Sequence, residues 1–236
     1  MDKVNLPKRF YKTAAAAERE DGYGVELDGR PIKTPAKSDL ILPTKALANA
    51  VAREWEDQGE HLDLQAMTLT RLANVAIDRT PETRADLALE LARYAGTDVT
   101  CYLADAPSEL RARQEAAWQP WRDWAGKTLG IMLVPVIGLM ASPQPQASLD
   151  AVKDYALTRD DFRLTALSWG CSLFGSAVLA LAVEAGALKA EAALAASCVD
   201  EDWQAEQWGE DDEAKEIRLA RGRDAAALQV WFDALA

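Results

Sequence analysis

The chain has 236 residues, 49% of them apolar, so it can bury the core of one large domain or of two modest ones. Its formal charge of -12 argues against nucleic acid and anionic membranes as partners, because both attract clustered lysine and arginine. A basic or mixed protein surface is the better candidate partner. The start, Met1–Phe10, has no apolar run of signal-peptide length and no transit-peptide pattern, which predicts that the chain stays where it is made.

The first quarter of the chain is predicted to form a small antiparallel sheet. Gly24–Leu27 and Arg30–Thr34 alternate in polarity around Asp28-Gly29, a dipeptide typical of a two-residue hairpin turn. The segments Phe10–Thr13 and Asp39–Pro43 are plausible partner strands. A hairpin at Asp28-Gly29 is therefore the first expected element.

The period of the apolar residues changes at Thr44. Apolar residues recur every four positions from Leu47 to Trp55, and Thr44 is suited to cap the helix that this period indicates. Helical periodicity continues through the rest of the chain. The sequence therefore predicts an α+β protein with a β-rich N-terminal domain over residues 1–43 and an α-helical domain over residues 44–236.

Helices are expected at successive positions of the second domain. Gly130–Gly138 is too interrupted for a long helix and is interpreted as a buried extended connector. The uncharged run between Arg163 and Glu184 is rich in small residues, which favours a helix enclosed by other helices over a membrane span. The expected helices are Leu69–Ile77, Thr80–Gly96, one from Ser108 broken or kinked at Pro120, Ser148–Ala156, Asp160–Ala185, Lys189–Trp208, and one from Asp212 with Ile217, Leu228, Trp231 and Leu235 on its apolar stripe.

The cysteines and the single histidine do not form a pattern typical of a catalytic or metal-binding site. Cys101, Cys171 and Cys198 are far apart among apolar neighbours, which indicates buried thiols in a reducing compartment. His61 has no nucleophile motif nearby and is interpreted as a solvated loop residue. The sequence has no glycine-rich phosphate-binding pattern. We therefore expect no catalytic residue, no metal and no cofactor.

The segment Asp200–Glu213 joins a dense acidic patch to two tryptophans. The simplest interpretation is a solvated helix end, since acidic side chains also favour the first turn of a helix. Trp203 and Trp208 favour another interpretation, in which the carboxylates meet arginine and lysine of a partner and the indoles supply contact energy. The residues expected to bind the partner are Asp200, Glu201, Asp202, Trp203, Glu206 and Trp208.

Short motifs are spread over nearly the full length of the chain. The most specific are Leu27–Pro35, which contains the hairpin dipeptide, and Trp203–Gly209. The others are Lys8–Lys12, Leu42–Thr44, Glu54–Gln58, Met67–Thr70, Tyr94–Asp98, Gln114–Pro120 and Ser168–Ala182. With these motifs the chain resembles the assembly chaperones that hold the free alpha subunit of the F-type ATP synthase catalytic head.

The resemblance implies a small β domain followed by a larger α domain, in agreement with the change of period at Thr44. It implies a binding protein, without ATP or catalysis, that shields the assembly surface of the alpha subunit until the beta subunit takes it over. We expect the chain to be a monomer. The family's client-contacting acidic position falls among Asp200, Glu201 and Asp202, and Trp203 replaces the family's tyrosine. The implied location is the cytoplasm in bacteria and the mitochondrial matrix for organellar relatives.

Two alternatives remain open. A carboxylate-based hydrolase could use a pair such as Glu54 and Glu56 or Asp160 and Asp161, and would require an enclosed pocket with two acidic groups at catalytic spacing. A general acidic protein-interaction module would bind unrelated clients through the same acidic surface. An open, convex acidic face would favour a binding protein over the hydrolase.

Overall fold

The computed structural model describes residues 6–138, 140 and 142–236. Contacts divide the chain into two compact units, one containing the chain up to Glu82 together with Asp233–Ala236, and the other containing Thr83–Phe232. Strands give way to helices at Thr44, which confirms the α+β class. Helix α1 (Lys45–Glu56) belongs to the first unit because it packs against the small sheet. The expected domain division between residues 43 and 44 stays a prediction.

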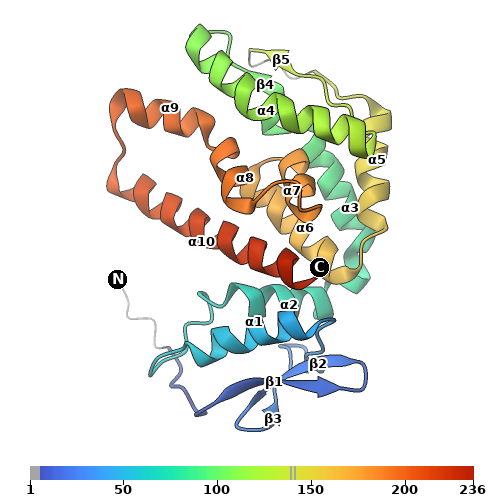
Figure 1. Ribbon diagram of the computed structural model, residues 1–236, viewed down its shortest axis with the longest axis vertical. Helices are drawn as coiled ribbons and strands as arrows, with labels where there is room; N and C mark the ends of the chain where they lie inside the picture. Colours follow the sequence, from blue (N-terminus) through green and yellow to red (C-terminus); the bar gives the residue numbers. More distant parts are fainter. Residues whose placement is uncertain (1–5, 139, 141) are drawn as a thin grey trace. The chain divides into compact units, whose positions relative to one another are not determined.

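The first unit holds a three-stranded antiparallel sheet in the order β1-β2-β3 (Figure 1). Its strands are β1 (Ala14–Arg19), β2 (Gly22–Leu27) and β3 (Arg30–Pro31). The hairpin at Asp28-Gly29 is confirmed, since both residues have the positive φ angles, 48° and 77°, that a tight primed turn requires. Thr44 caps α1 as predicted, because its side chain accepts a hydrogen bond from the Leu47 backbone N–H at 3.1 Å.

The first strand was assigned to the wrong residues. It runs over Ala14–Arg19, four of whose residues are alanine, a poor strand former, and six residue pairs with β2 hold it in place. The predicted strand at Asp39–Pro43 is reduced to isolated bridges that join Leu42 to Tyr23 and Asp39 to Lys33. Tertiary pairing therefore overrides local propensity in this sheet.

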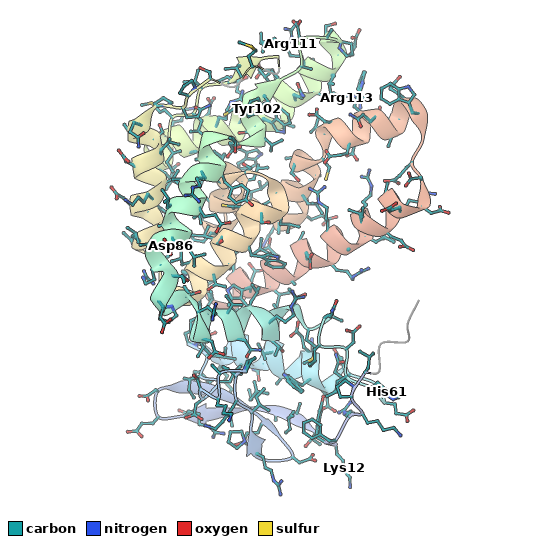
Figure 2. The ribbon with its side chains drawn as sticks, turned by 180° about the vertical axis from the view of Figure 1, so that it is seen from behind. Lys12, His61, Asp86, Tyr102, Arg111 and Arg113 are labelled. Atoms are coloured by element: carbon teal, nitrogen blue, oxygen red, sulfur yellow. The ribbon has the colours of Figure 1, made fainter. Side chains whose placement is uncertain are left out.

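The chain before β1 lies against the loop that follows α1. The backbone N–H of Arg9 donates to the carbonyl of Glu60 at 2.9 Å, and His61 forms an isolated bridge with Lys8. His61 is exposed, which confirms its interpretation as a solvated loop residue, and it lies at the edge of this unit together with Lys12 (Figure 2).

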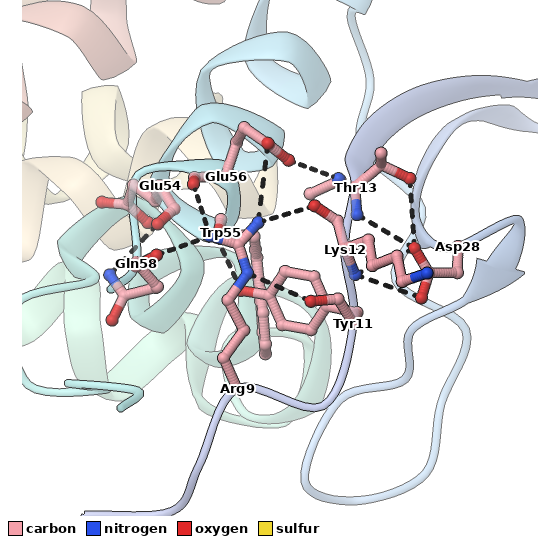
Figure 3. A network of polar contacts seen from close by, with 10 residues as sticks. Arg9, Tyr11, Lys12, Thr13, Asp28, Glu54, Trp55, Glu56 and Gln58 are labelled. Atoms are coloured by element: carbon pink, nitrogen blue, oxygen red, sulfur yellow. Dashed lines mark hydrogen bonds and ion pairs between the residues drawn. The ribbon is translucent and has the colours of Figure 1, made fainter. Parts of the chain in front are cut away.

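The segment Phe10–Thr13 was expected to form a strand, but its backbone groups form hydrogen bonds with side chains instead (Figure 3). The Asp28 carboxylate accepts from the backbone N–H groups of Lys12 and Thr13 at 3.0 and 2.9 Å, and these bonds lower its pKa. The Arg9 guanidinium donates to the carbonyls of Tyr11, Lys12, Glu56 and Gln58. Three of the sequence motifs, Lys8–Lys12, Leu27–Pro35 and Glu54–Gln58, thus meet in one polar network that ties the N-terminal segment to α1.

The helical part of the chain continues with α2 (Thr68–Asp78) in the first unit, and α3 (Thr80–Gly96) leads into the second. The second unit also holds η1 (Val99–Cys101), β4 (Tyr102–Leu103), α4 (Ser108–Leu129), β5 (Val136–Ile137), α5 (Gln146–Leu157), α6 (Asp161–Phe174), α7 (Ala177–Glu184), α8 (Ala190–Ser197), α9 (Val199–Trp208) and, up to Phe232, α10 (Asp212–Ala234). Strands β4 and β5 pair in parallel. All eight residues of α7 are buried, so this helix forms the centre of the unit. Among the described residues, none of the helices combines the length and apolarity needed to cross a membrane.

Two expected helices are each divided in two. Gly175 adopts a left-handed φ of 61° and ends α6, and the Ser176 side chain then caps α7 by accepting from Leu179 N–H at 3.0 Å. The second division falls at Cys198, between α8 and α9. Helix α4, in contrast, continues through Pro120, so the predicted break is wrong, while the alternative of a kink stays a prediction. Trp118, two residues before Pro120, is fully buried, so the helix is packed against the rest of the unit at this point.

The connector Gly130–Gly138 is only half buried, which corrects the expectation of a buried segment. Ile131 and Leu133 are buried, whereas Met132 and Val134 are exposed, because successive side chains of an extended chain point in opposite directions. The three cysteines are buried free thiols, as predicted, and burial raises the pKa of Cys101 to about 12.

Candidate partner-binding site

Helix α9 carries all six residues that the sequence predicts to bind a partner. Asp200, Glu201 and Asp202 lie in its first turn, where the positive end of the helix dipole favours carboxylates. No residue of α9 is buried, so the helix lies on the surface of the second unit. Gly209, with a φ of 83°, ends α9, and the Asp211 carboxylate starts α10 by accepting from Ala214 N–H at 2.8 Å.

One face of α9 is attached to α4. It presents Asp200, Trp203 and Glu206, which are three residues apart and therefore share a side of the helix. Asp200 accepts from the buried Gln114 amide at 2.7 Å. Both Glu206 oxygens accept from Arg113 at 2.8 Å, and the Arg113 guanidinium lies 4.7 Å from the centre of the Trp203 ring. Arg113 is labelled on α4 in Figure 2. The bond with Arg113 lowers the pKa of Glu206.

The other face of α9 is directed toward α10. Asp202 pairs with Arg218 at 2.5 Å, and the same guanidinium reaches Glu210 at 2.8 Å, so that it bridges the connection between the two helices. Hydrogen bonds to these two carboxylates raise the pKa of Arg218. Glu201 pairs more loosely with Arg221, at 3.5 Å. The acidic side chains on this face are therefore paired within the chain.

A groove of about 660 Å³ lies between α8, α9 and α10. Two large apolar side chains border it with much of their surface in solvent, because Trp208 is 80% exposed and Ile217 is 53% exposed. Its charged lining contains five carboxylates and two guanidiniums, which leaves it acidic. These charged residues are Glu191, Glu201, Asp202, Glu210, Asp211, Arg218 and Arg221. The acidic surface is thus hollowed and has apolar walls, in contrast to an open convex face.

The structure divides the six predicted residues into two sets of three. Glu201, Asp202 and Trp208 line the groove, whereas the other three contact α4 or lie beside it. The sequence did not single out Arg113 and Gln114 of α4, or Leu194 of α8, as residues near this site. Arg113 and Gln114 lie more than 80 residues before α9 in the sequence, and no local pattern connects them with it.

Ile217 was assigned to the wrong environment. The sequence placed it on the apolar stripe of the last helix with Leu228 and Trp231, which are indeed fully buried. Residues 211–219 are exposed, so the first turns of α10 extend beyond the core and carry Ile217 to the groove. An isoleucine among charged residues was the available signal for a surface contact.

The carboxylate pairs that a hydrolase could use take part in structural contacts. Glu54 accepts from the backbone N–H groups of Leu69 and Thr70 at 2.7 and 2.8 Å and so caps α2, although burial raises its pKa. Asp160 caps α6, and Asp161 pairs with Arg84. Among the described residues there is no cluster of three or more potential metal ligands. The chemistry that the α9 groove offers is the binding of a cation beside an apolar group.

Comparisons with known proteins agree over most of the chain. A family model described as ATP12 chaperone protein matches residues 8–126. The crystal structure of Atp12 from Paracoccus denitrificans is 39% identical, with a TM-score of 0.87, and the match covers 96% of each chain. The Atu1473 protein of Agrobacterium tumefaciens is 40% identical, with a TM-score of 0.92 over 98% of this chain and 87% of that chain.

A more distant relative extends the same likeness to eukaryotes. The mitochondrial protein atp12 of Schizosaccharomyces pombe is 25% identical in an alignment 222 residues long, which covers 89% of this chain and 76% of the relative. The family match and the solved structures lead to one conclusion. This chain belongs to the ATP12 chaperone family, the ATP synthase assembly chaperones that its sequence motifs resemble.

Proposed function

We propose that this chain binds the free alpha subunit of F-type ATP synthase and shields its assembly surface until the beta subunit replaces it. The observation that carries the proposal is Trp208, an indole that is 80% exposed beside an acidic groove in a member of a chaperone family. Exposed indoles are typical of the residues that dominate binding energy at protein interfaces. A subunit that waits for its partner exposes an apolar surface that such a residue can cover.

Charge supports a basic client surface. The chain carries a formal charge of -12, and the groove lining has three more carboxylates than guanidiniums. Complementary charge accelerates association, and salt screens it over about 10 Å at 0.1 M ionic strength. We therefore expect the association rate constant with the alpha subunit to fall as salt is added, while the dissociation rate constant changes much less.

The function requires reversible binding. The beta subunit can displace a chaperone by mass action only if its own interface with the alpha subunit is the stronger one. Excess beta subunit should therefore release this chain from a preformed complex with the alpha subunit, as followed by size-exclusion chromatography. A complex that persists under a large excess of beta subunit would contradict the proposal.

The direct test is suppression of alpha-subunit aggregation, measured by light scattering. Trp208→Ala and Glu201→Lys should each lose most of the suppression, because they remove an exposed apolar contact and reverse a charge of the groove. Gln207→Ala and Glu213→Lys are matched controls, since both residues are exposed but do not line the groove. Full suppression by both groove variants would remove this surface from the site.

The proposal includes the remaining properties expected from the sequence. The chain acts as a monomer, without turnover of a small molecule, in the bacterial cytoplasm or, for organellar relatives, in the mitochondrial matrix. Light scattering coupled to chromatography should give the mass of one copy for the free chain and of one copy of each protein for the complex. A general acidic module would instead suppress the aggregation of unrelated basic clients equally well.

A further inference from the structure

We propose that the groove between α8, α9 and α10 takes one basic amphipathic segment of the client. An apolar side chain of that segment enters between Trp208 and Ile217, and an arginine or lysine beside it replaces Arg218 on Asp202. The identity of the client rests on the function proposed above, whereas the chemistry of the segment rests on the groove alone.

The walls of the groove indicate an apolar anchor. Leu194 of α8, Trp208 of α9 and Ile217 of α10 border the same space, and alanines of α8, α9 and α10 complete its apolar lining. Trp208 and Ile217 are large and mostly exposed, so an inserted side chain would remove apolar surface from water on both sides of the groove. A segment with a single large apolar residue fits this arrangement.

The rim of the groove indicates that the segment is basic. Five carboxylates and two guanidiniums line it, so three negative charges remain after every internal pair is counted. An acidic or neutral segment would bring no compensation for these charges, whereas arginine or lysine on either side of the anchor would. Charge complementarity therefore selects a basic segment.

Arg218 occupies the position that a client cation would take. Its guanidinium is held between Asp202 on α9 and Glu210 at the following turn, and the paired side chains of Arg218 and Asp202 are 43% and 41% exposed. Such exposed ion pairs contribute little to stability, so one guanidinium can be exchanged for another at small cost. Arg221 differs, because it also donates to the Leu173 carbonyl and to the Ser197 hydroxyl, which anchor it inside the unit.

The anchor is tested with a synthetic probe on the full-length chain. The probe is a fluorescein-labelled peptide of leucine and lysine in amphipathic spacing, and its dissociation constant is measured by fluorescence anisotropy. Ile217→Asp should weaken binding about tenfold, because it removes the apolar wall against which a leucine of the probe would pack. Leu219→Asp is the matched control, since Leu219 is also exposed on α10 but does not line the groove, and it should stay within about twofold.

The exchange is tested by removing the internal cation. Arg218→Gln should tighten probe binding about fivefold at low salt, because Asp202 and Glu210 then meet the lysines of the probe without a competitor. Lys215→Gln is the control, because Lys215 pairs with Asp212 outside the groove and its loss should leave the affinity unchanged. Weaker or unchanged binding by Arg218→Gln would overturn the exchange.

The two proposals fail in different ways. If the chain binds the probe with the expected variant pattern but does not bind the alpha subunit, the proposed function fails and the groove chemistry stands. If the alpha subunit binds and Ile217→Asp behaves like Leu219→Asp, the groove is not the docking site. An equally tight complex with a leucine and glutamate peptide would also overturn the inference.

Thermal unfolding of each variant checks the fold, and Ile217→Ser replaces Ile217→Asp if the charge prevents folding.

Discussion

Two sets of carboxylates in the second unit differ in burial and in the number of donors they meet. Asp98 is completely buried and accepts from the N–H and hydroxyl of Thr100, the Ser176 hydroxyl and the Val178 N–H. On α9, the side chains of Glu201 and Glu206 are 55% and 51% exposed, and each pairs with a single arginine. Acidic residues are more densely spaced on α9, yet it is the buried carboxylate of Asp98 that joins two elements, η1 and the start of α7.

This difference shows why acidic composition alone does not identify a site. A buried carboxylate loses its hydration and is stable only where several donors replace the water. An exposed pair gains little from its partner and can exchange it. The interior carboxylates should therefore govern stability, and the groove-lining carboxylates should govern binding.

The largest expected loss of stability follows removal of Asp98. Asp98→Ala leaves the donors of Thr100, Ser176 and Val178 unpaired at the junction of η1 and α7, and should lower the free energy of unfolding by about 4 kcal/mol. Asp202→Ala, the exposed counterpart, should lower it by less than about 1 kcal/mol. Urea denaturation measures both. Equal losses would abolish the distinction between the two sets.

Glu184 should have a smaller effect than Asp98. Its carboxylate is almost fully buried and accepts from Tyr155 and Arg163, with Arg159 at 3.6 Å, but both arginines are partly exposed and can turn to water. Glu184→Ala should therefore lower the free energy of unfolding by about 2 kcal/mol. Circular dichroism during urea denaturation measures this change, and a loss below that of Asp202→Ala would contradict it.

The same cluster makes a prediction about pH. Burial, followed by the hydrogen bond to Glu184, raises the pKa of Tyr155 from 10.0 to about 12. Because the pKa is raised, the contribution of protonated Tyr155 to the stability of the fold is complete below pH 10. It is lost as the pH rises through the pKa of the folded state. In Glu184→Ala, absorbance titration should show the pKa of Tyr155 move back toward 10. No change would show that the hydrogen bond to Glu184 does not contribute.

The smallest predicted effect concerns the exposed pair on α9. The bond to Arg113 lowers the pKa of Glu206 from 4.5, so any stability from this pair is present above pH 4.5 and is lost as the pH falls through the lowered value. Arg113→Gln should return the pKa of Glu206 to its ordinary range, as read by NMR titration of the carboxyl carbon. The melting temperature at neutral pH should hardly change, and a large drop would show that α9 depends on this pair.

Local rules in the sequence located the elements that local chemistry determines. The Asp28-Gly29 turn and the Thr44 cap depend on residues within a few positions of each other, and both were found. Strand β1 was misplaced because its alanines are held by pairing with β2. The division at Gly175 was missed because a glycine in an apolar run is compatible with a continuous helix as well as with its end.

The sequence placed the candidate site on a single surface helix, α9, but it did not reveal that the helix has two faces with different contacts. Spacing alone separates Asp200, Trp203 and Glu206 from the remaining three residues. The sequence does not show which of the two faces packs against the rest of this chain. That depends on Arg113 of α4 and Arg218 of α10, which approach α9 only in the folded chain. Sequence reasoning therefore proposed six candidate residues on α9 without separating those that contact α4 from those that line the groove.

The two tryptophans of α9 give the most direct test of the account. Trp208 is exposed at the groove, whereas Trp203 stacks on Arg113 beside α4. Isothermal titration with purified alpha subunit should show that Trp208→Ala weakens binding by about 30-fold and that Trp203→Ala weakens it by less than about fivefold. Thermal unfolding should show that Trp208→Ala leaves the melting temperature unchanged. Wild-type affinity in Trp208→Ala, with the loss appearing in Trp203→Ala instead, would contradict the account.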